Sequence, residues 1–405
     1  MIETGCCIVG GGPAGIMLGL LLARAGVDVV VLEKHPDFFR DFRGDTIHPS
    51  TLDVMGQLDL LEPLLRLPHQ EMTTVSATFH GKQYRISDFS HLPTESKFIA
   101  FMPQWDFLNF LVRHANQYPT FHLRMNTEFT DLIEEGGRVT GVRARSPQGP
   151  IEIRSVLVVG ADGRHSRVRD RTGLTVHQSG VPIDVLWLRI PKNPSLPPQS
   201  LGYLDRDKFM VLIDRGDYFQ CGYLIPKGSF AELQERGLAA FRASIAALAP
   251  ATAQGVEQLR SWDDVSLLTV LIDRLDRWSR PGVLCIGDAA HAMSPVGGVG
   301  INLAIQDAVA TANLLAEKLR TGRVTAADLD LVQERREYPA RAIQRMQAFV
   351  HRHLLNAEVT AGRSVLVRCV LVLVHWIPAL GRIPARFIGV GPRPERVEIA
   401  EWPPQ

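Results

Sequence analysis

The chain has 405 residues, with 44 Lys or Arg against 43 Asp or Glu and a formal net charge of +1. This balance argues against a basic surface for nucleic acid and against an acidic tail. With 45% apolar and 21% charged residues, the composition is typical of a soluble globular protein and excludes disorder, collagen and coiled coil. At about 100–200 residues per domain, the length predicts two or three domains.

The five cysteines are odd in number, scattered, and without the spacing of metal ligands. They predict reduced thiols in a cytoplasmic protein and no metal site. No basic region of a signal peptide precedes the first apolar run. A late apolar stretch, residues 364–380, contains Arg368 and His375, so we reject a membrane-spanning helix there.

The first 34 residues predict a βαβ unit. An apolar strand at 6–9 is followed by a glycine-rich turn at 10–15, a helix at about 16–25 and a β-branched strand at 27–32. Because two strands joined by a crossover helix lie parallel, this unit indicates an α/β fold with a parallel sheet.

The middle of the chain alternates helical and strand patterns. Apolar spacing predicts helices at 46–67 and 104–115, with strands and loops between them at 73–97. A small β-meander is then predicted, with strands at 121–124, 129–134, 139–145 and 151–153, leading into a buried strand at 156–159.

The second half begins with residues 181–225, whose alternation of apolar and polar residues predicts antiparallel strands. A helix at about 230–249, a buried strand at 282–286 and a long helix at about 301–319 follow. The last 60 residues are helical and then rich in proline.

The turn after the first strand has the form GxGxxG, and each glycine has its own task. Gly10 permits the tight turn, Gly12 lets a pyrophosphate approach the backbone, and Gly15 allows the helix to pack closely. The phosphates would lie at the helix N-terminus, beside Pro13 and Ala14. Glu33, 18 residues after Gly15, would accept hydrogen bonds from ribose hydroxyls, which suits the adenosine of FAD or NAD better than NADP.

A second strand-to-turn motif lies late in the chain. Gly287 and Asp288 follow the strand at 282–286, and Pro295 and a glycine loop at 297–302 precede the long helix. Asp288 could hold the hydroxyls of a polyol, and the helix N-terminus would stabilise the negative charge of a reduced flavin.

In their order, three motifs resemble those of the single-component FAD-dependent aromatic hydroxylases, the p-hydroxybenzoate hydroxylase-like family. They consist of Gly10, Gly12 and Gly15; of Asp162, Gly163, Ser166 and Arg169; and of Gly287, Asp288, Pro295 and the loop 297–302. The resemblance implies a Rossmann-like FAD-binding domain with an inserted antiparallel β-sheet domain for the substrate and a helical C-terminus. We assign residues 1–174 and 276–345 to the FAD-binding domain, 175–275 to the substrate domain and 346–405 to the C-terminal segment. Segment 73–97 could belong to either of the first two.

The resemblance also implies the contacts of FAD. Arg43 would contact the phosphate or ribityl region, Gln104 would contact the FAD chain, and the backbone of 300–302 would contact the isoalloxazine. Alternatively, Arg43 and Gln104 are solvated surface residues. For Asp162 the alternative is a role in a turn or as a helix cap. The expected FAD-binding residues are Gly10, Gly12, Pro13, Ala14, Gly15, Glu33, Lys34, Arg43, Gln104, Asp162, Arg169, Gly287, Asp288, Pro295, Gly298, Gly300, Ile301 and Asn302.

The chain has no second GxGxxG unit and no Cys-x-x-Cys pair. The co-substrate NAD(P)H would therefore bind transiently to the FAD-binding domain. The resemblance implies that NAD(P)H reduces FAD, that O2 gives a flavin C4a-hydroperoxide, and that a small aromatic, phenolic, polyketide-like or quinone-like substrate is hydroxylated. The alternatives are a flavin-dependent reductase of isoprenoid double bonds, a halogenase, which the lone Trp376-Ile377-Pro378 disfavours, and a non-catalytic flavin-binding protein.

Candidate catalytic residues are His48 and Pro295, the latter near the reacting edge of the flavin. His48, like His291, could instead be a hydrogen-bonded structural residue. Candidate substrate residues on the predicted sheet are Trp187, Arg189, Tyr203 and Tyr223, with plain core packing as the alternative. For the segment 363–386 we favour packing over membrane contact, and a homodimer is left open.

Overall fold

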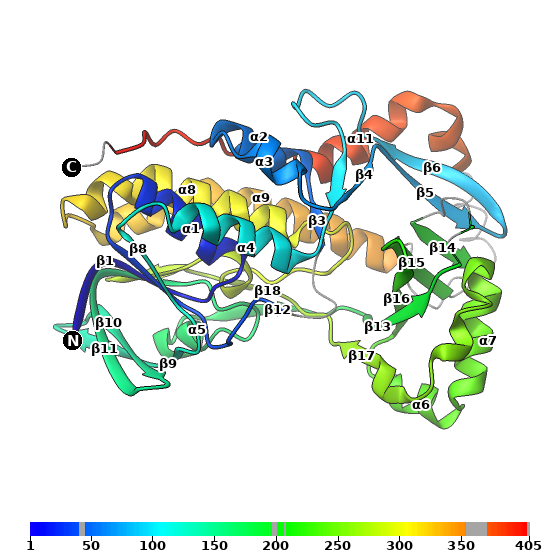
Figure 1. The fold of residues 1–405 in the computed structure, drawn as a ribbon, viewed down its shortest axis with the longest axis horizontal. Helices are drawn as coiled ribbons and strands as arrows, with labels where there is room; N and C mark the ends of the chain where they lie inside the picture. The colour runs from blue at the N-terminus through cyan, green and yellow to red at the C-terminus, as the bar shows by residue number, and fades with distance from the viewer. Residues whose placement is uncertain (40–44, 194, 197–200, 206–207, 354–370, 403–405) are drawn as a thin grey trace.

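The computed structural model describes residues 1–405 except 40–44, 194, 197–200, 206–207, 354–370 and 403–405. Two β-sheets lie toward opposite ends of the long axis, and a layer of long helices covers the larger one (Figure 1). The predicted α/β class is confirmed.

The larger sheet runs in the order β19-β20-β11-β1-β2-β8, with β10 paired to β11 and β9 paired to β10. The contacts of β1 with β2 and β11, of β2 with β8 and of β11 with β20 are parallel. The strands are β1 (Ile2–Val9), β2 (Val29–Leu32), β8 (Phe121–Arg124), β9 (Glu128–Glu135), β10 (Arg138–Ser146), β11 (Gly149–Gly160), β19 (Ser279–Arg280) and β20 (Val283–Cys285).

The predicted meander at 121–160 is wrong in one respect. β8 does not pair with β9 but lies parallel to β2 at the sheet edge. The reason is the ring of Phe121, which packs so closely under helix α1 that a methyl group on Gly19 would come within 2.8 Å of it. The two strands predicted at 151–153 and 156–159 are one continuous strand, β11.

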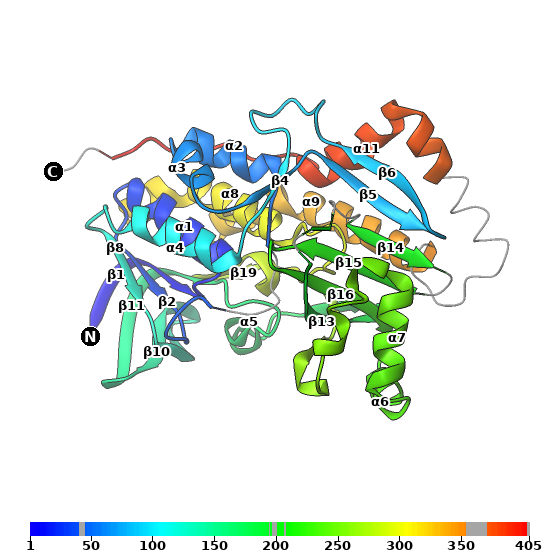
Figure 2. The ribbon, with the colours of Figure 1, turned by 45° about the vertical axis from the view of Figure 1, so that its right-hand side comes forward.

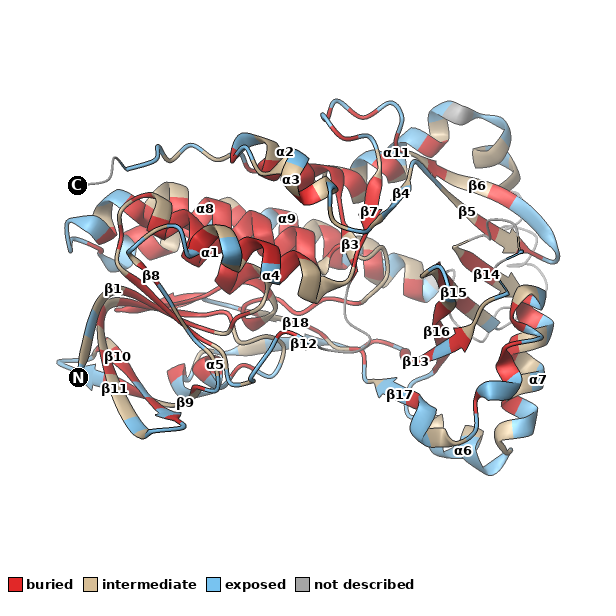
Figure 3. Ribbon diagram, in the orientation of Figure 1, coloured by how far each residue is buried: buried red, intermediate tan, exposed pale blue. Residues whose placement is uncertain are grey.

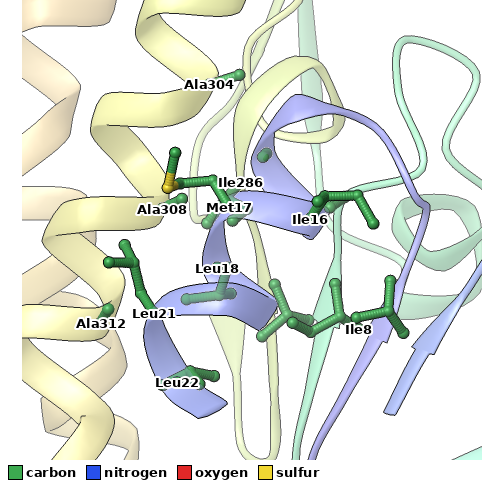
Figure 4. Packing of buried hydrophobic residues seen from close by; sticks show 14 of the residues in the cluster. Ile8, Ile16, Met17, Leu18, Leu21, Leu22, Ile286, Ala304, Ala308 and Ala312 are labelled. Carbon is green, nitrogen blue, oxygen red and sulfur yellow. The ribbon is translucent and has the colours of Figure 1, made fainter. Parts of the chain in front are cut away.

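Helices α1 (Pro13–Arg24), α4 (Gln104–Ala115), α8 (Gly300–Arg320) and α9 (Ala326–His353) form the helical layer. In Figure 4, Met17 and Leu21 of α1 face Ala304, Ala308 and Ala312 of α8. These alanines recur every fourth residue, so they lie in one row and let the two helices approach closely.

Two helices predicted as single elements are interrupted. Residues 46–67 form β3 (Thr46–Ile47), α2 (Pro49–Gln57) and α3 (Leu61–Leu65), with Asp59 in a left-handed conformation (φ 59°) between the helices. Residues 230–249 form α6 (Phe230–Glu235) and α7 (Leu238–Leu248), separated by Gly237 with φ 87°. A left-handed residue cannot continue a right-handed helix, so each helix ends there.

The second sheet has seven strands in the order β17-β13-β16-β15-β14-β5-β6. The strands are β5 (Thr74–Phe79), β6 (Lys82–Asp88), β13 (Ile183–Pro191), β14 (Gly202–Asp205), β15 (Lys208–Asp214), β16 (Tyr218–Pro226) and β17 (Val265–Leu268). β5 pairs with β14, so residues 74–88 join the sheet of the predicted substrate domain. α7 covers one face of this sheet (Figure 2).

The remaining elements connect the two sheets. β7 (Ile99–Phe101) pairs with β4 (Gln70–Met72) on one side and with β3 on the other. β12 (Val176–Ser179) pairs with β18 (Ile272–Leu275), and the last of these elements is the short helix α5 (Arg167–Thr172).

The C-terminal part does not begin at residue 346 as a separate unit, because α9 runs through that position without a break. Helix α11 (Pro378–Gly389) lies beside β6, and the chain then returns along the helical layer until Trp402 donates its backbone N–H to Arg24. Among the described residues, no helix combines the length and apolar character that crossing a membrane requires. Cys6, Cys7, Cys221 and Cys285 are free and buried, and Cys369 lies outside the described residues.

Candidate active site

The first glycine turn is as tight as its sequence predicts. Gly10 has φ 111°, and a Cβ there would lie 2.4 Å from the carbonyl oxygen of Ala161. A Cβ on Gly15 would lie 1.9 Å from the carbonyl oxygen of Gly10. Both positions therefore require glycine for the fold itself.

Gly12 differs from its neighbours. Its backbone is extended (φ −78°, ψ −175°), which any residue adopts, and no atom lies within 4 Å of the place where a Cβ would be. The protein gives no reason for glycine here. The open space beside Gly12 at the start of α1 is the place where the backbone can approach a pyrophosphate, so the residues present fit this part of FAD.

The N-termini of α1 and α8 meet at the second turn. A Cβ on Gly287 would lie 3.3 Å from Ala14 of α1 and 3.5 Å from Ala304 of α8. Neither helix has a capping side chain or an acidic residue in its first turn, and the space beside Gly300 is open. Two helix ends with free N–H groups thus share one corner, which favours an anionic ligand.

Asp288 lies beside this corner, half-buried, and Arg164 places its Nη2 3.5 Å from the Asp288 carboxylate. The Arg164 Nη1 is buried and has no hydrogen-bond partner among the described residues. An unsatisfied guanidinium nitrogen at this place indicates a further anionic or hydroxyl-bearing ligand. Arg164 was missed because it occupies a variable position of the second motif.

Glu33 ends β2, and its carboxylate accepts the backbone N–H of Gly11 at 3.1 Å and of His35 at 3.0 Å. These bonds hold it next to the glycine turn, as the ribose prediction requires, whereas Lys34 is exposed. Gln104 is the first residue of α4, and its N–H donates to Asp45 at 3.3 Å. Arg43 lies outside the described residues.

The second motif, which contains Asp162, Ser166 and Arg169, connects neighbouring structural elements. Asp162 accepts hydrogen bonds from the Ser166 hydroxyl and from the N–H of Val168, and Ser166 caps α5. Arg169 is 7% exposed and pairs with Asp273 at 3.3 Å, which in turn accepts the N–H of Ala292 at 3.1 Å. These side chains therefore tie β18 to the loop after Asp288, and a direct contact of Asp162 or Arg169 with FAD stays a prediction.

Gly298, in the glycine loop before α8, accepts the hydroxyl of Thr46 at 2.9 Å and donates its N–H to the carbonyl of Pro295 at 3.0 Å. Asn302 is 2% exposed, and its side-chain oxygen accepts the hydroxyls of Ser50 and Thr51. Its side chain thus fixes α8 to α2, which leaves only the backbone of Gly300, Ile301 and Asn302 for a flavin.

His48 is fully buried behind this loop. Its Nδ1 lies 2.9 Å from the carbonyl oxygen of Ile388, and its Nε2 faces the backbone of Gly298 without a hydrogen bond of normal geometry to any described residue. Burial lowers the pKa of His48 to about 4, so the ring is neutral at pH 7. Because a carbonyl only accepts, Nδ1 carries the proton and Nε2 remains a hydrogen-bond acceptor.

His291 is a structural residue. It is 2% exposed, and its Nε2 lies 2.6 Å from Asp307, which also pairs with the buried Arg336 at 2.9 Å. Burial alone would raise the pKa of Asp307, but the contacts with His291 and Arg336 hold it below its ordinary value.

The four substrate candidates separate onto two faces of the seven-stranded sheet. Tyr203 and Tyr223 pack with the residues under α7, and the Tyr223 hydroxyl lies 2.9 Å from Ser244 of that helix. Their assignment to a substrate pocket is corrected, because alternate residues of a strand point to opposite faces. Trp187 and Arg189 lie on the other face, where Trp187 packs against the cluster that contains Ile213 and Phe101.

An ion pair that the sequence did not reveal joins the β15–β16 hairpin to the segment just before β3. Arg215, at the tip of the β15–β16 hairpin, pairs with Asp45, and their side chains are only 8% and 7% exposed. Gln220 accepts the Arg215 Nε at 3.1 Å. Burial raises the pKa of Asp45, although Arg215 acts against this rise. Nothing in the sequence marks these residues, since they are 170 positions apart.

A second group of buried polar residues that was not predicted from the sequence lies on α9. Gln344, Gln347 and His351 are buried and contact the loop before Pro295: Gln347 accepts the N–H of Ser294 at 3.1 Å and donates to the carbonyls of Ser294 and Val296 at 2.8 and 2.9 Å. Gln344 donates to Ala292 at 3.1 Å. Their spacing of three and four residues, typical of one helix face, was the available signal.

The parallel sheet, the open Gly12 and the shared helix corner define a dinucleotide-binding protein. The chain matches the FAD binding domain family over residues 3–346. It is similar to 6-methylpretetramide 4-monooxygenase of Streptomyces rimosus, with 34% identity over 398 residues, 98% of this chain and 94% of the relative. It is 27% identical to dialkyldecalin synthase of Streptomyces rugosporus over 317 residues, 75% of this chain and 63% of that relative.

A solved structure, p-nitrophenol 4-monooxygenase from Pseudomonas putida DLL-E4, superposes with a TM-score of 0.81 at 22% identity, covering 97% of this chain and 100% of that one. The chain belongs to the FAD binding domain family, and its predicted resemblance to the FAD-dependent aromatic hydroxylases is confirmed.

Proposed function

We propose that the protein uses FAD, NAD(P)H and O2 to hydroxylate a small phenolic or polyketide-type aromatic substrate. The observation that carries this proposal is the position of His48, whose buried acceptor nitrogen lies directly behind the glycine loop of the FAD site. The name of the most extensively matched relative reported above, a monooxygenase acting on a methylpretetramide, supports the substrate class.

FAD, when bound, would supply the activation of oxygen. The N-terminus of α8 would stabilise negative charge on the flavin, and the corner around Gly12 and Gly287 would hold the pyrophosphate. The Nε2 of His48 would accept a hydrogen bond from a phenolic hydroxyl, which orients the substrate and makes its ring more electron-rich. Pro295 would border the reacting edge, and the apolar inner face of the sheet around Trp187 would exclude water.

The buried indole N–H of Trp187 has no partner among the described residues, so a substrate carbonyl or phenol oxygen would satisfy it. The substrate would then lie between the sheet face that carries Trp187 and the loop that carries Gly298. NAD(P)H would have to reach the same FAD from the exposed side of the second motif, near Arg164.

The test is turnover by the FAD-loaded protein. NADH or NADPH oxidation, O2 uptake and product mass are measured with p-nitrophenol, with a tetracyclic phenolic polyketide and with the O-methyl ethers of both. We expect phenols to accelerate oxidation and to gain one oxygen atom, and the ethers, which have no proton for His48, to react poorly. FAD reduction that never yields an oxygenated product contradicts the proposal. A product of unchanged mass would instead place the protein with ring-forming relatives such as the dialkyldecalin synthase.

A further inference from the structure

A cavity of about 230 Å³ lies where the end of α9 meets the segment between β12 and β13. Its apolar walls come from Val181, Pro182, Ile272 and Ala348, and Ser179, Gly180, His351 and Arg352 also line it. None of the residues that face the substrate side of the sheet takes part in it.

His351 offers this cavity a hydrogen-bond donor. The side chain is 1% exposed, and its Nε2 lies 2.7 Å from the hydroxyl oxygen of Ser294. That oxygen also accepts the N–H of Val296 at 3.2 Å, and the Ser294 hydroxyl still has its proton to donate to the Nε2 of His351. With that bond made, the neutral ring carries its proton on Nδ1, which has no partner among the described residues.

The protonation state agrees with this arrangement. Burial lowers the pKa of His351 to about 4, so the ring is neutral at pH 7 and its Nδ1 is a donor without a charge. The positive charge of the site comes from Arg352, which is exposed and forms no ion pair with any residue that the structure describes.

These features select one kind of ligand. A buried N–H donor requires an acceptor oxygen, an unpaired guanidinium favours a negative charge on it, and the apolar walls require an apolar body. The cavity is smaller than the 300–1,000 Å³ of typical drug-sized pockets, so it has room for one ring and not for a polycycle.

We propose that this cavity is a second binding site, which takes a one-ring aromatic anion such as a benzoate-type carboxylate, with its oxygen on the Nδ1 of His351 and near Arg352. The proposal does not depend on the proposed hydroxylation, since the cavity lining includes neither Trp187 nor Arg189. Two contacts connect the cavity to the loop around Pro295: the hydrogen bond between Ser294 and His351, and the bonds of Gln347, the neighbour of Ala348.

The test is calorimetric titration of the FAD-loaded protein with sodium benzoate. We expect one site, weaker binding of the uncharged benzamide, and an affinity at least about tenfold lower in His351→Phe, which keeps a ring but removes the donor. Arg352→Gln should weaken binding a few-fold and remove most of its salt dependence.

Ala348→Trp fills the cavity without touching the hydrogen bonds of His351, so it should abolish binding even if His351→Phe proves unstable. Ala342→Trp, on the same helix but outside the lining, is the matched control and should bind as wild type does. Absence of benzoate binding to the wild type overturns the proposal. So does binding that persists unchanged in Ala348→Trp, because benzoate then lies elsewhere, for example on the substrate face.

Discussion

At Gly12 the backbone is extended and the neighbouring space is open, so a side chain there would meet the ligand and not the protein. We therefore expect Gly12→Val to weaken FAD binding by about tenfold or more. The stability of the apoprotein should change by no more than about 0.5 kcal/mol. Flavin fluorescence titration and thermal unfolding measure the two effects.

The matched variant is Gly15→Val, in which the new side chain would collide with the carbonyl of Gly10. It should lower the stability of the apoprotein itself, so the two glycines of one motif separate cofactor binding from folding. Retention of wild-type FAD affinity by Gly12→Val would show that the open space is not the phosphate site.

His48 should make stability depend on pH. Its pKa is about 4 in the folded protein and about 6.5 in the unfolded chain, so between these values the unfolded chain binds more protons. The stabilisation is complete above about pH 6.5 and is lost as the pH falls toward 4, with a slope of about 1.4 kcal/mol per pH unit. Denaturant unfolding at several pH values should show that His48→Gln lacks this part of the slope.

The control is His165→Gln, since the side chain of His165 is exposed and forms no ion pair with any residue that the structure describes. Its removal should leave the slope unchanged. An equal slope in wild type and His48→Gln would mean that the buried ring is not neutral at pH 7.

Among single residues, the sequence predicts those whose role depends on the backbone, such as Gly10 and Gly15, because the spacing of the glycines indicates the geometry of the turn. It is less informative for Asp162 and Arg169. Both belong to the second motif, but Asp162 contacts α5 and Arg169 contacts Asp273. Only the folded chain shows which partner pairs with each charged group. Tyr203 and Tyr223 were misplaced for a similar reason, since the strand pattern shows alternation but not which face meets the FAD site.

Among the elements, α9 holds the loop before Pro295 through Gln347, whose amide satisfies one N–H and two carbonyls of that loop. Gln347→Leu keeps a side chain of similar size but leaves these buried groups unpaired. We expect a loss of about 1–3 kcal/mol in the free energy of unfolding. With the loop loosened, a larger share of NAD(P)H oxidation should appear as hydrogen peroxide and a smaller share as hydroxylated product.

Arg345→Ala is the control, because Arg345 is exposed on the same helix. Peroxide formation and unfolding are compared in the three proteins. If Gln347→Leu couples NAD(P)H oxidation to product as well as Arg345→Ala does, the loop does not depend on α9.

Element boundaries were predictable where a pattern changes and not where a single residue ends a helix. The helix at 104–115 was predicted with its observed limits, whereas Asp59 and Gly237 divide the helices at 46–67 and 230–249. The apolar spacing continues across both breaks, so periodicity alone could not locate them. The position of β8 beside β2 depends on Phe121 under α1, a contact between residues about 100 positions apart.

For the whole molecule, the pair of Arg215 and Asp45 is a buried charge contact between the seven-stranded sheet and the segment before β3. Arg215→Gln leaves Asp45 buried without its partner, so we expect a loss of about 3 kcal/mol, within the range for broken buried pairs. The double variant with Asp45→Asn removes both charges and should recover part of the loss. Thermal unfolding of wild type, both single variants and the double variant gives the coupling energy.

The exposed pair of Arg277 and Asp330 supplies the comparison, with side chains 70% and 41% exposed. Arg277→Gln should change stability by no more than about 0.5 kcal/mol. A loss no larger for Arg215→Gln than for Arg277→Gln would mean that apolar packing alone holds the hairpin to the segment before β3. Figure 3 shows that many residues of α1, α8 and the strands beneath them are buried.

The order of strands in the larger sheet also determines when each strand can pair during synthesis of the chain. β1 leaves the ribosome first, but β11, its neighbour, and β20, next to β11, end only at residues 160 and 285. At about 5–20 residues per second, the roughly 270 residues between β1 and β20 take about 15–55 s to synthesise. β2 and β11, the two partners of β1, are made earlier, but until β20 is made β11 lacks its second parallel neighbour and Gly287 has not yet come beside Ala14 of α1. With the pyrophosphate held at this corner, as we propose, FAD would bind only after this stage of synthesis.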